Sequence, residues 1–146
     1  MATKVTEHFT LEEMSATSHE DLQQANYKYA ENRMWALINI CKLLEEVRSV
    51  LECPLIISSG VRCPELNERL GGARNSQHMR CEAADFVPAR HSVEDAFDII
   101  YKSNIRFDQM ILERSGGKTW LHISCSHAPR RESLIYDKGK YKKYTG

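Results

Sequence analysis

The chain has 146 residues and a formal net charge of zero, because 20 Lys and Arg balance 20 Asp and Glu. This length is typical of one domain, and 42% hydrophobic with 27% charged residues is a globular rather than a disordered composition. We therefore expect a single domain over residues 1–146, monomeric and without the basic excess of a nucleic-acid binder. No apolar run is long enough to span a membrane, and the N-terminus lacks the apolar core of a signal peptide.

Helical patterns dominate the first half of the sequence. Thr10 and Glu13 form a capping box, which predicts a helix start. From about residue 26 to residue 51 the apolar residues recur at helical spacing and predict one long amphipathic helix packed on the core. These residues are Met34, Leu37, Ile38, Cys41, Leu44, Val47 and Leu51. A proline-led segment over 64–70 predicts a short helix, and Ser92 predicts the cap of another that runs to about 103.

Strand patterns follow. Short apolar runs at 55–58 and 83–87 predict two strands. Residues 107–113 and 119–124 flank a Gly-Gly pair, which predicts a β-hairpin that turns about Gly116 and Gly117. The fold class is therefore α+β, with N-terminal helices packed on a small antiparallel sheet. From about residue 137 the Lys-rich end of the chain predicts a basic, solvated tail.

The residues best suited to catalysis lie in two short segments. His78 precedes Asp85, which lies in an apolar strand where an unpaired carboxylate would be costly. His122 lies on a later strand between apolar neighbours. Two imidazoles and a carboxylate would make a catalytic zinc set that leaves the fourth position for water. Taken singly, His122 could be a hydrogen-bonded core histidine, and Asp85 could pair with Arg62.

Together these segments resemble the D-alanyl-D-alanine carboxypeptidase-like zinc peptidases, which share their core fold with the Hedgehog signalling domain. The resemblance runs from residue 8 to residue 124. It is carried by Ser58-Ser59-Gly60-Val61-Arg62, Leu66-Asn67, Gly71-Gly72-Ala73, Ser76-Gln77-His78, Ala83-Ala84-Asp85, Phe107-Asp108-Gln109 and Trp120-Leu121-His122-Ile123-Ser124. The chain looks most like the small, single-domain branch common in bacteriophages and prophages, whose members cut peptidoglycan stem peptides.

The resemblance implies one zinc ion held by His78, Asp85 and His122. It places Arg62 near the metal, where a planar and permanently charged guanidinium can stabilise an oxyanion or hold a substrate carboxylate. The structural alternative is a salt bridge from Arg62 to Asp85 or Glu82.

Further positions follow from the same resemblance. Ser76 and Gln77 are expected to shape the loop before the first ligand and, with Trp120, to line the substrate site. Cys81 stands where the family usually has glycine. A thiol there could bind the metal or oxidise, but we expect it to pack in the core, because the ligand set is complete without it. The odd count of five cysteines, with no Cys-x-x-Cys pair, likewise predicts free thiols.

The general base is the part of the family's pattern that is missing. Relatives often carry an acidic residue three positions before the last ligand or a His two positions before it, and here these positions hold Thr119 and Trp120. In the predicted hairpin Glu113 lies opposite Trp120 and is the diagonal neighbour of His122, roughly 7–8 Å away. We therefore predict Glu113 as the base. The alternatives are that Glu113 only pairs with a basic neighbour in the hairpin, or that His127 is the base.

These observations predict a zinc metallopeptidase that hydrolyses bacterial cell-wall stem peptides, as a D,D-carboxypeptidase or an L-Ala–D-Glu endopeptidase, and that could serve as a phage endolysin. The alternative is a non-catalytic zinc-binding or peptidoglycan-binding module of the same fold, because the usual acid near His122 is missing. The lack of a signal peptide predicts synthesis in the cytoplasm, with delivery to the wall by phage lysis or from a virion.

Overall fold

The computed structural model describes residues 2–146. Within that part of the chain there are five α-helices, one 3-10 helix and six strands. In chain order they are α1 (Leu11–Ser15), η1 (Glu20–Leu22), α2 (Gln23–Glu31), α3 (Met34–Leu51), β1 (Leu55–Ser59), α4 (Pro64–Arg69), β2 (Ala83–Pro88), α5 (Val93–Tyr101), β3 (Gln109–Ser115), β4 (Lys118–Ser124), β5 (Glu132–Asp137) and β6 (Lys140–Lys143). None of these helices is both long and apolar enough to cross a bilayer.

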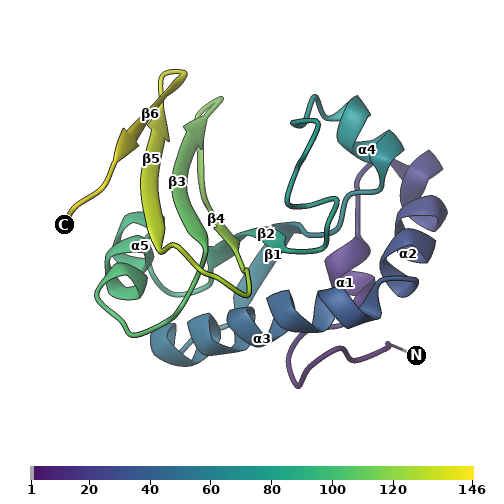
Figure 1. Ribbon diagram of the computed structural model, residues 1–146, viewed down its shortest axis with the longest axis horizontal. Helices are drawn as coiled ribbons and strands as arrows, with labels where there is room; N and C mark the ends of the chain where they lie inside the picture. The colour runs from purple at the N-terminus through teal and green to yellow at the C-terminus, as the bar shows by residue number, and fades with distance from the viewer. Residues whose placement is uncertain (1) are drawn as a thin grey trace.

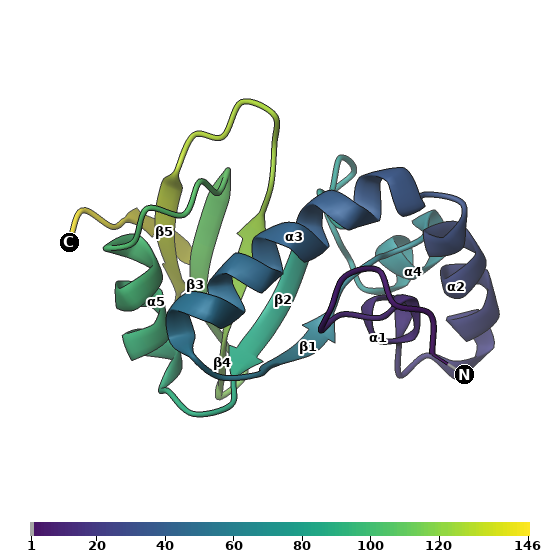
Figure 2. The ribbon, with the colours of Figure 1, turned by 90° about the horizontal axis from the view of Figure 1, so that it is seen from below.

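The six strands form one sheet in the order β1-β2-β4-β3-β5-β6. Neighbouring strands are antiparallel except β3 and β5. These two run parallel because β4 ends beside the start of β3 and residues 125–131 lead across to the other side of that same end, where β5 begins. Helices α3 and α5 cover one face of the sheet, whereas α1, α2 and α4 gather near its β1 end (Figures 1 and 2). The α+β class is therefore confirmed, with one parallel pair that the sequence patterns do not predict.

The single helix predicted from about residue 26 to residue 51 is wrong. The chain forms α2 and then α3, with a break at Asn32 and Arg33, where the φ of Arg33 is −126°. The buried Asn26 of α2 donates to the carbonyls of Ser15 and Val61, whereas α3 packs against α5 and β2. One straight helix could not face both sets of partners. The apolar stripe lies within α3, although Ile38 is exposed.

The core lies between the two covering helices and the sheet. Its sheet-side members are Ala84, Phe86, Met110, Leu112, Leu121 and Ile123, all of them buried. Side chains alternate between the faces of a strand, so Asp85, His122 and Glu113 lie on the opposite, open face. The hairpin register confirms the prediction, because Ile111 pairs with His122 and Glu113 pairs with Trp120. Local sequence pattern thus decides which side chains reach the open face.

The basic C-terminal segment is exposed from Lys138 to Lys143, as its composition predicts, but it is a strand rather than an irregular tail. It forms β6, which pairs with β5 as a hairpin. The rings of Tyr136 and Tyr141 pack with centroids 4.7 Å apart, and Tyr144 packs edge-on against Phe97 and Tyr101 with centroids 4.8 Å from each. The aromatic residues between the lysines supply the apolar contact area that holds this strand on the sheet.

Candidate metal centre

Three side chains converge on the open face of the sheet. Asp85 on β2 pairs directly with His122 on β4, and His78 comes from the loop between α4 and β2. Each of the three is buried, and each offers a ligand atom within 4.8 Å of the other two. The structure therefore brings together the three residues that the motifs single out, although His122 lies 37 residues from Asp85 in sequence.

The orientation of His78 is set by a backbone carbonyl. Its Nδ1 donates to the oxygen of Gly60 at 2.7 Å, so the other ring nitrogen, Nε2, is left with a lone pair. That Nε2 lies 3.3 Å from Oδ1 of Asp85. Burial lowers the pKa of the His78 imidazole, which keeps it neutral and fit to bind a metal.

The Asp85 carboxyl is ionised. Burial alone would raise its pKa, yet this pKa lies below its usual range, and the permanently charged guanidinium of Arg62 lies 3.4 Å from its Oδ2. An ionised carboxylate and the lone pair of His78 thus face each other at 3.3 Å, an arrangement that a bound cation would stabilise. Two imidazoles and one carboxylate are also the donor set of catalytic zinc sites. These residues therefore fit a zinc ion.

Gly60 occupies a position that has no room for a side chain. A Cβ there would lie 2.3 Å from the backbone oxygen of Met14 in α1, and the amide of Val61 donates to the same oxygen at 2.8 Å. The close approach of α1 thus requires glycine in the Ser-Ser-Gly-Val-Arg motif. It also fixes the carbonyl that orients His78.

Gly60→Ala should therefore lower both stability and metal affinity. We expect the free energy of unfolding to fall by about 1–3 kcal/mol in chemical denaturation, because the backbone of α1 must move. Gly139→Ala is the control: its φ is 75° with no atom within 4 Å of the added Cβ, so it should cost about 1 kcal/mol of strain and leave metal affinity unchanged. Wild-type stability and metal affinity in Gly60→Ala would contradict this role.

Arg62 reaches the same centre from the end of that motif. Its Nε donates to Oγ of Ser59 at 3.1 Å, and its Nη2 lies 3.4 Å from Oδ2 of Asp85. The predicted alternative partner Glu82 instead pairs with Arg80. Arg62 is thus held beside the candidate ligands by a contact with one of them. The salt bridge to Asp85, the structural alternative, is observed, and the role of Arg62 toward a substrate stays a prediction.

Glu113 lies on β3, on the same face of the sheet as His122. Burial, followed by the negative charge of Asp85, raises the pKa of Glu113. Its basic neighbour Arg114 pairs with Glu94 and Asp137 instead, and within residues 2–146 no salt bridge to Glu113 is found. The Trp120 indole lies beside the Glu113 carboxylate but outside hydrogen-bonding geometry, so its buried N–H has no partner in the described chain.

One cleft of about 660 Å³ contains these groups. Its lining residues come from the loop after α4 on one side and from strands β3 to β6 on the other. Figure 1 shows where these segments lie in the fold. The predicted site residues that line it are Arg62, Ser76, Gln77, His78, Asp85, Glu113, Trp120 and His122. His127, the alternative base, instead lines a separate hollow beside Trp35 of α3. The geometry therefore favours Glu113 over His127.

Two tyrosines that line the cleft were missed by the sequence analysis. Tyr136 and Tyr141 line its wall from β5 and β6, and their strands pair next to β3 so that Tyr136 lies opposite Glu113. The apolar run over 134–136 is the signal that could have predicted a strand here. The lysines that follow this run led to the prediction of a solvated tail instead.

Cys81 packs away from the three ligands. Its side chain is buried in the core, and burial raises the pKa of its thiol to about 11. The φ of Cys81 is 57°, a left-handed conformation that glycine adopts without penalty, which explains why relatives favour glycine at this position. All five cysteines are free, as predicted.

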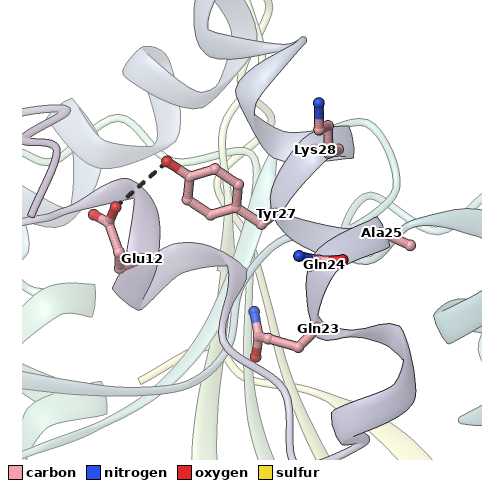
Figure 3. Close-up of a pocket in the computed structure, with 6 residues that line it drawn as sticks. All are labelled: Glu12, Gln23, Gln24, Ala25, Tyr27 and Lys28. Carbon is pink, nitrogen blue, oxygen red and sulfur yellow. Dashed lines mark hydrogen bonds between the residues drawn. The ribbon is translucent and has the colours of Figure 1, made fainter.

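Another hollow, of about 800 Å³, lies between α1 and α2 (Figure 3). In it the Tyr27 hydroxyl donates to Oε2 of Glu12 at 3.4 Å, and the other lining residues are Gln23, Gln24, Ala25 and Lys28. It has a single carboxylate and no imidazole among these lining residues. The chemistry is therefore concentrated in the cleft on the sheet.

The family model described as Peptidase M15 matches the chain over residues 7–124. The chain belongs to the M15 peptidases. No curated protein matches it. The matched residues of this M15 peptidase include the three candidate ligands, Arg62 and Glu113, but they end before β5 and β6. Membership confirms the resemblance carried by the motifs, and it implies zinc metallopeptidase activity on peptidoglycan-related substrates.

Proposed function

We propose that this M15 peptidase hydrolyses stem peptides of the bacterial cell wall, as a D,D-carboxypeptidase or an L-Ala–D-Glu endopeptidase. The observation that supports this most is the convergence of His78, Asp85 and His122 in a cleft that also holds Arg62 and Glu113. The resemblance to the phage branch of the family supports the role of an endolysin.

His78, Asp85 and His122 would hold one zinc ion. When bound, zinc would polarise the scissile carbonyl and lower the pKa of a coordinated water toward about 7. The rest of the reaction falls to side chains of the cleft. The raised pKa of Glu113 favours acceptance of a proton from the attacking water, and the same carboxyl can then deliver that proton to the leaving amine.

Arg62 and Trp120 are suited to hold the substrate. Arg62 uses Nε and Nη2 for Ser59 and Asp85, and a guanidinium has further N–H groups that can bind a substrate carboxylate or the oxyanion. The unpaired indole N–H of Trp120 can donate to a substrate carbonyl. Ser76 has a local task, because its Oγ accepts from the amide of His78 at 3.2 Å.

Arg62→Lys should reduce turnover while zinc stays bound. Lysine keeps the charge but loses the planar fork, so we expect hydrolysis to fall by roughly 10²-fold or more. The measurement is the rate on purified muropeptides together with zinc content. Arg69→Lys is the matched control, because Arg69 forms a similar pair with Asp21 on the surface. Unchanged turnover in Arg62→Lys would assign Arg62 a structural role through Asp85.

The second candidate is a non-catalytic module that binds peptidoglycan. The residues that favour it are Thr119 and Trp120, which replace the acid or imidazole of relatives. Mass spectrometry of muropeptides incubated with the zinc-loaded protein separates the candidates. Loss of a terminal D-Ala identifies a carboxypeptidase, and cleavage after L-Ala identifies an endopeptidase. Binding of muropeptides without any cleavage would support the module.

A further inference from the structure

We propose that Gln77, Asp108 and Arg130 form a chain of hydrogen bonds that determines which nitrogen of His122 carries its proton. These hydrogen bonds leave Nδ1 of His122 free as a ligand atom. Gln77, Asp108 and Arg130 are therefore positioning residues. The inference rests on the proposed function only in assuming that a metal binds at His122. It assigns a role to Asp108 and Arg130, neither of which is a candidate ligand.

The series of hydrogen bonds begins with the ion pair between Asp108 and Arg130. The Asp108 carboxylate is buried and accepts from Nε and Nη2 of Arg130, both at 2.9 Å, and from the backbone amide of Arg130 at 3.2 Å. Such a two-pronged pair favours the charged form of the acid, and Arg130 holds the pKa of Asp108 below its usual range. Asp108 is therefore an ionised carboxylate that can only accept hydrogen bonds.

The ionised carboxylate orients Gln77. Oδ2 of Asp108 lies 3.2 Å from Nε2 of Gln77. Because Asp108 cannot donate, the side-chain amide of Gln77 must turn its NH₂ group toward Asp108. Its other end, the carbonyl Oε1, must then point to the opposite side. The orientation of this amide is thus decided by its hydrogen-bond partner.

Gln77 in turn orients His122. Its Oε1 lies 3.2 Å from Nε2 of His122, and a carbonyl oxygen only accepts, so Nε2 of His122 carries the proton. In a neutral imidazole this leaves Nδ1 with the lone pair, 3.0 Å from Oδ1 of Asp85. Without Gln77, the imidazole beside Asp85 would favour the other tautomer, in which Nδ1 donates its proton to Oδ1 of Asp85. In that tautomer Nδ1 has no lone pair for a metal, and Oδ1 is occupied by the hydrogen bond. The chain of hydrogen bonds opposes that tautomer.

The ring of His78 is also oriented by a hydrogen-bond acceptor on its far side. There the acceptor behind the ring is the backbone carbonyl of Gly60, which leaves Nε2 free. Each imidazole ligand is thus held by an acceptor on its far side, a common arrangement around metal-binding histidines. Only His122 is held by side chains, so its tautomer can be changed by substitution while His78 serves as an internal reference.

Asp108→Asn tests the proposal with a nearly isosteric change. Arg130 has only donors, so the oxygen of the new amide should stay with Arg130 and its NH₂ group should face Gln77. Gln77 must then turn its own NH₂ group toward His122, which moves the His122 proton to Nδ1. Gln77→Met, which removes the acceptor altogether, should move the proton to the same nitrogen and leaves the Asp108–Arg130 pair intact.

The direct readout is nitrogen-15 NMR of the histidine side chains in the metal-free full chain at mildly alkaline pH, where imidazoles are neutral. We expect the proton on Nε2 of His122 in the wild type and on Nδ1 in both variants, with His78 protonated on Nδ1 throughout. The second readout is zinc affinity by chelator competition, which should fall about 10- to 100-fold in both variants. Asp21→Asn is the control, because it weakens an exposed Asp–Arg pair neither member of which lines the cleft, and it should change neither readout.

A wild-type His122 protonated on Nδ1, or an unchanged tautomer in Gln77→Met, would overturn the proposal. So would wild-type zinc affinity in a variant whose tautomer has changed. If Asp108→Asn does not fold, Gln77→Met alone decides, because Gln77 is only half-buried. The NMR result involves no substrate, so it supports or overturns this chain of hydrogen bonds even if the protein hydrolyses no muropeptide.

Discussion

His78→Ala and His122→Ala should each remove most of the zinc from the purified protein, which we expect to hold about one ion per chain. The reason is that each substitution leaves only two protein ligands on a site built for three. Asp85 would also lose one of the two imidazoles that face its buried carboxylate. Elemental analysis of protein purified in zinc-supplemented medium measures the effect.

His127→Ala is the matched control for this experiment, because His127 is exposed and lies outside the cleft. Its zinc content should equal that of the wild type. Equally low zinc in the wild type and the two ligand variants would contradict the metal site. Full zinc occupancy in both ligand variants would show that the ion binds elsewhere.

Glu113→Gln should retain zinc but lower hydrolysis of muropeptides by roughly 10²–10⁴-fold. Glutamine keeps the shape of the side chain beside Trp120 and removes its capacity to accept and return a proton. The raised pKa of Glu113 arises from burial and from the charge of Asp85, so the carboxyl is more basic than an exposed glutamate. The measurement combines initial rates by mass spectrometry with zinc content for each variant.

Glu68→Gln, on the exposed side of α4, is the control and should keep both full activity and zinc. Full activity in Glu113→Gln would rule out Glu113 as the base. Within residues 2–146 no other carboxyl group except the ligand Asp85 lines the cleft. A fully active Glu113→Gln variant would therefore require a proton acceptor other than a side-chain carboxylate.

Much of the site could be predicted from the sequence because it depends on local geometry. The alternation of side chains along each strand points Asp85 away from the buried Ala84 and Phe86. A hairpin that turns about two glycines places Glu113 opposite Trp120. The capping box at Thr10 and the serine cap at Ser92 are both observed. Each of these features involves residues that are close in sequence or directly paired across a short turn.

The tertiary structure decided the features that depend on distant partners. The break before α3 exists because Asn26 must reach the loop at residues 61–63, including the amide of Cys63 at 2.8 Å. The C-terminal strand packs its Tyr141 against Tyr136 of β5, a contact that the count of lysines does not reveal.

The hydrogen bonds that orient the ring of His122 could not be predicted from the sequence either. Gln77 contacts Asp108 and His122 across 31 and 45 residues of sequence, respectively. No periodicity relates residues so far apart, and the direction of an amide becomes determined only when its neighbours on both sides are known. The sequence by itself therefore determined which residues could bind the metal, and only the folded chain decided how their imidazoles are oriented to do so.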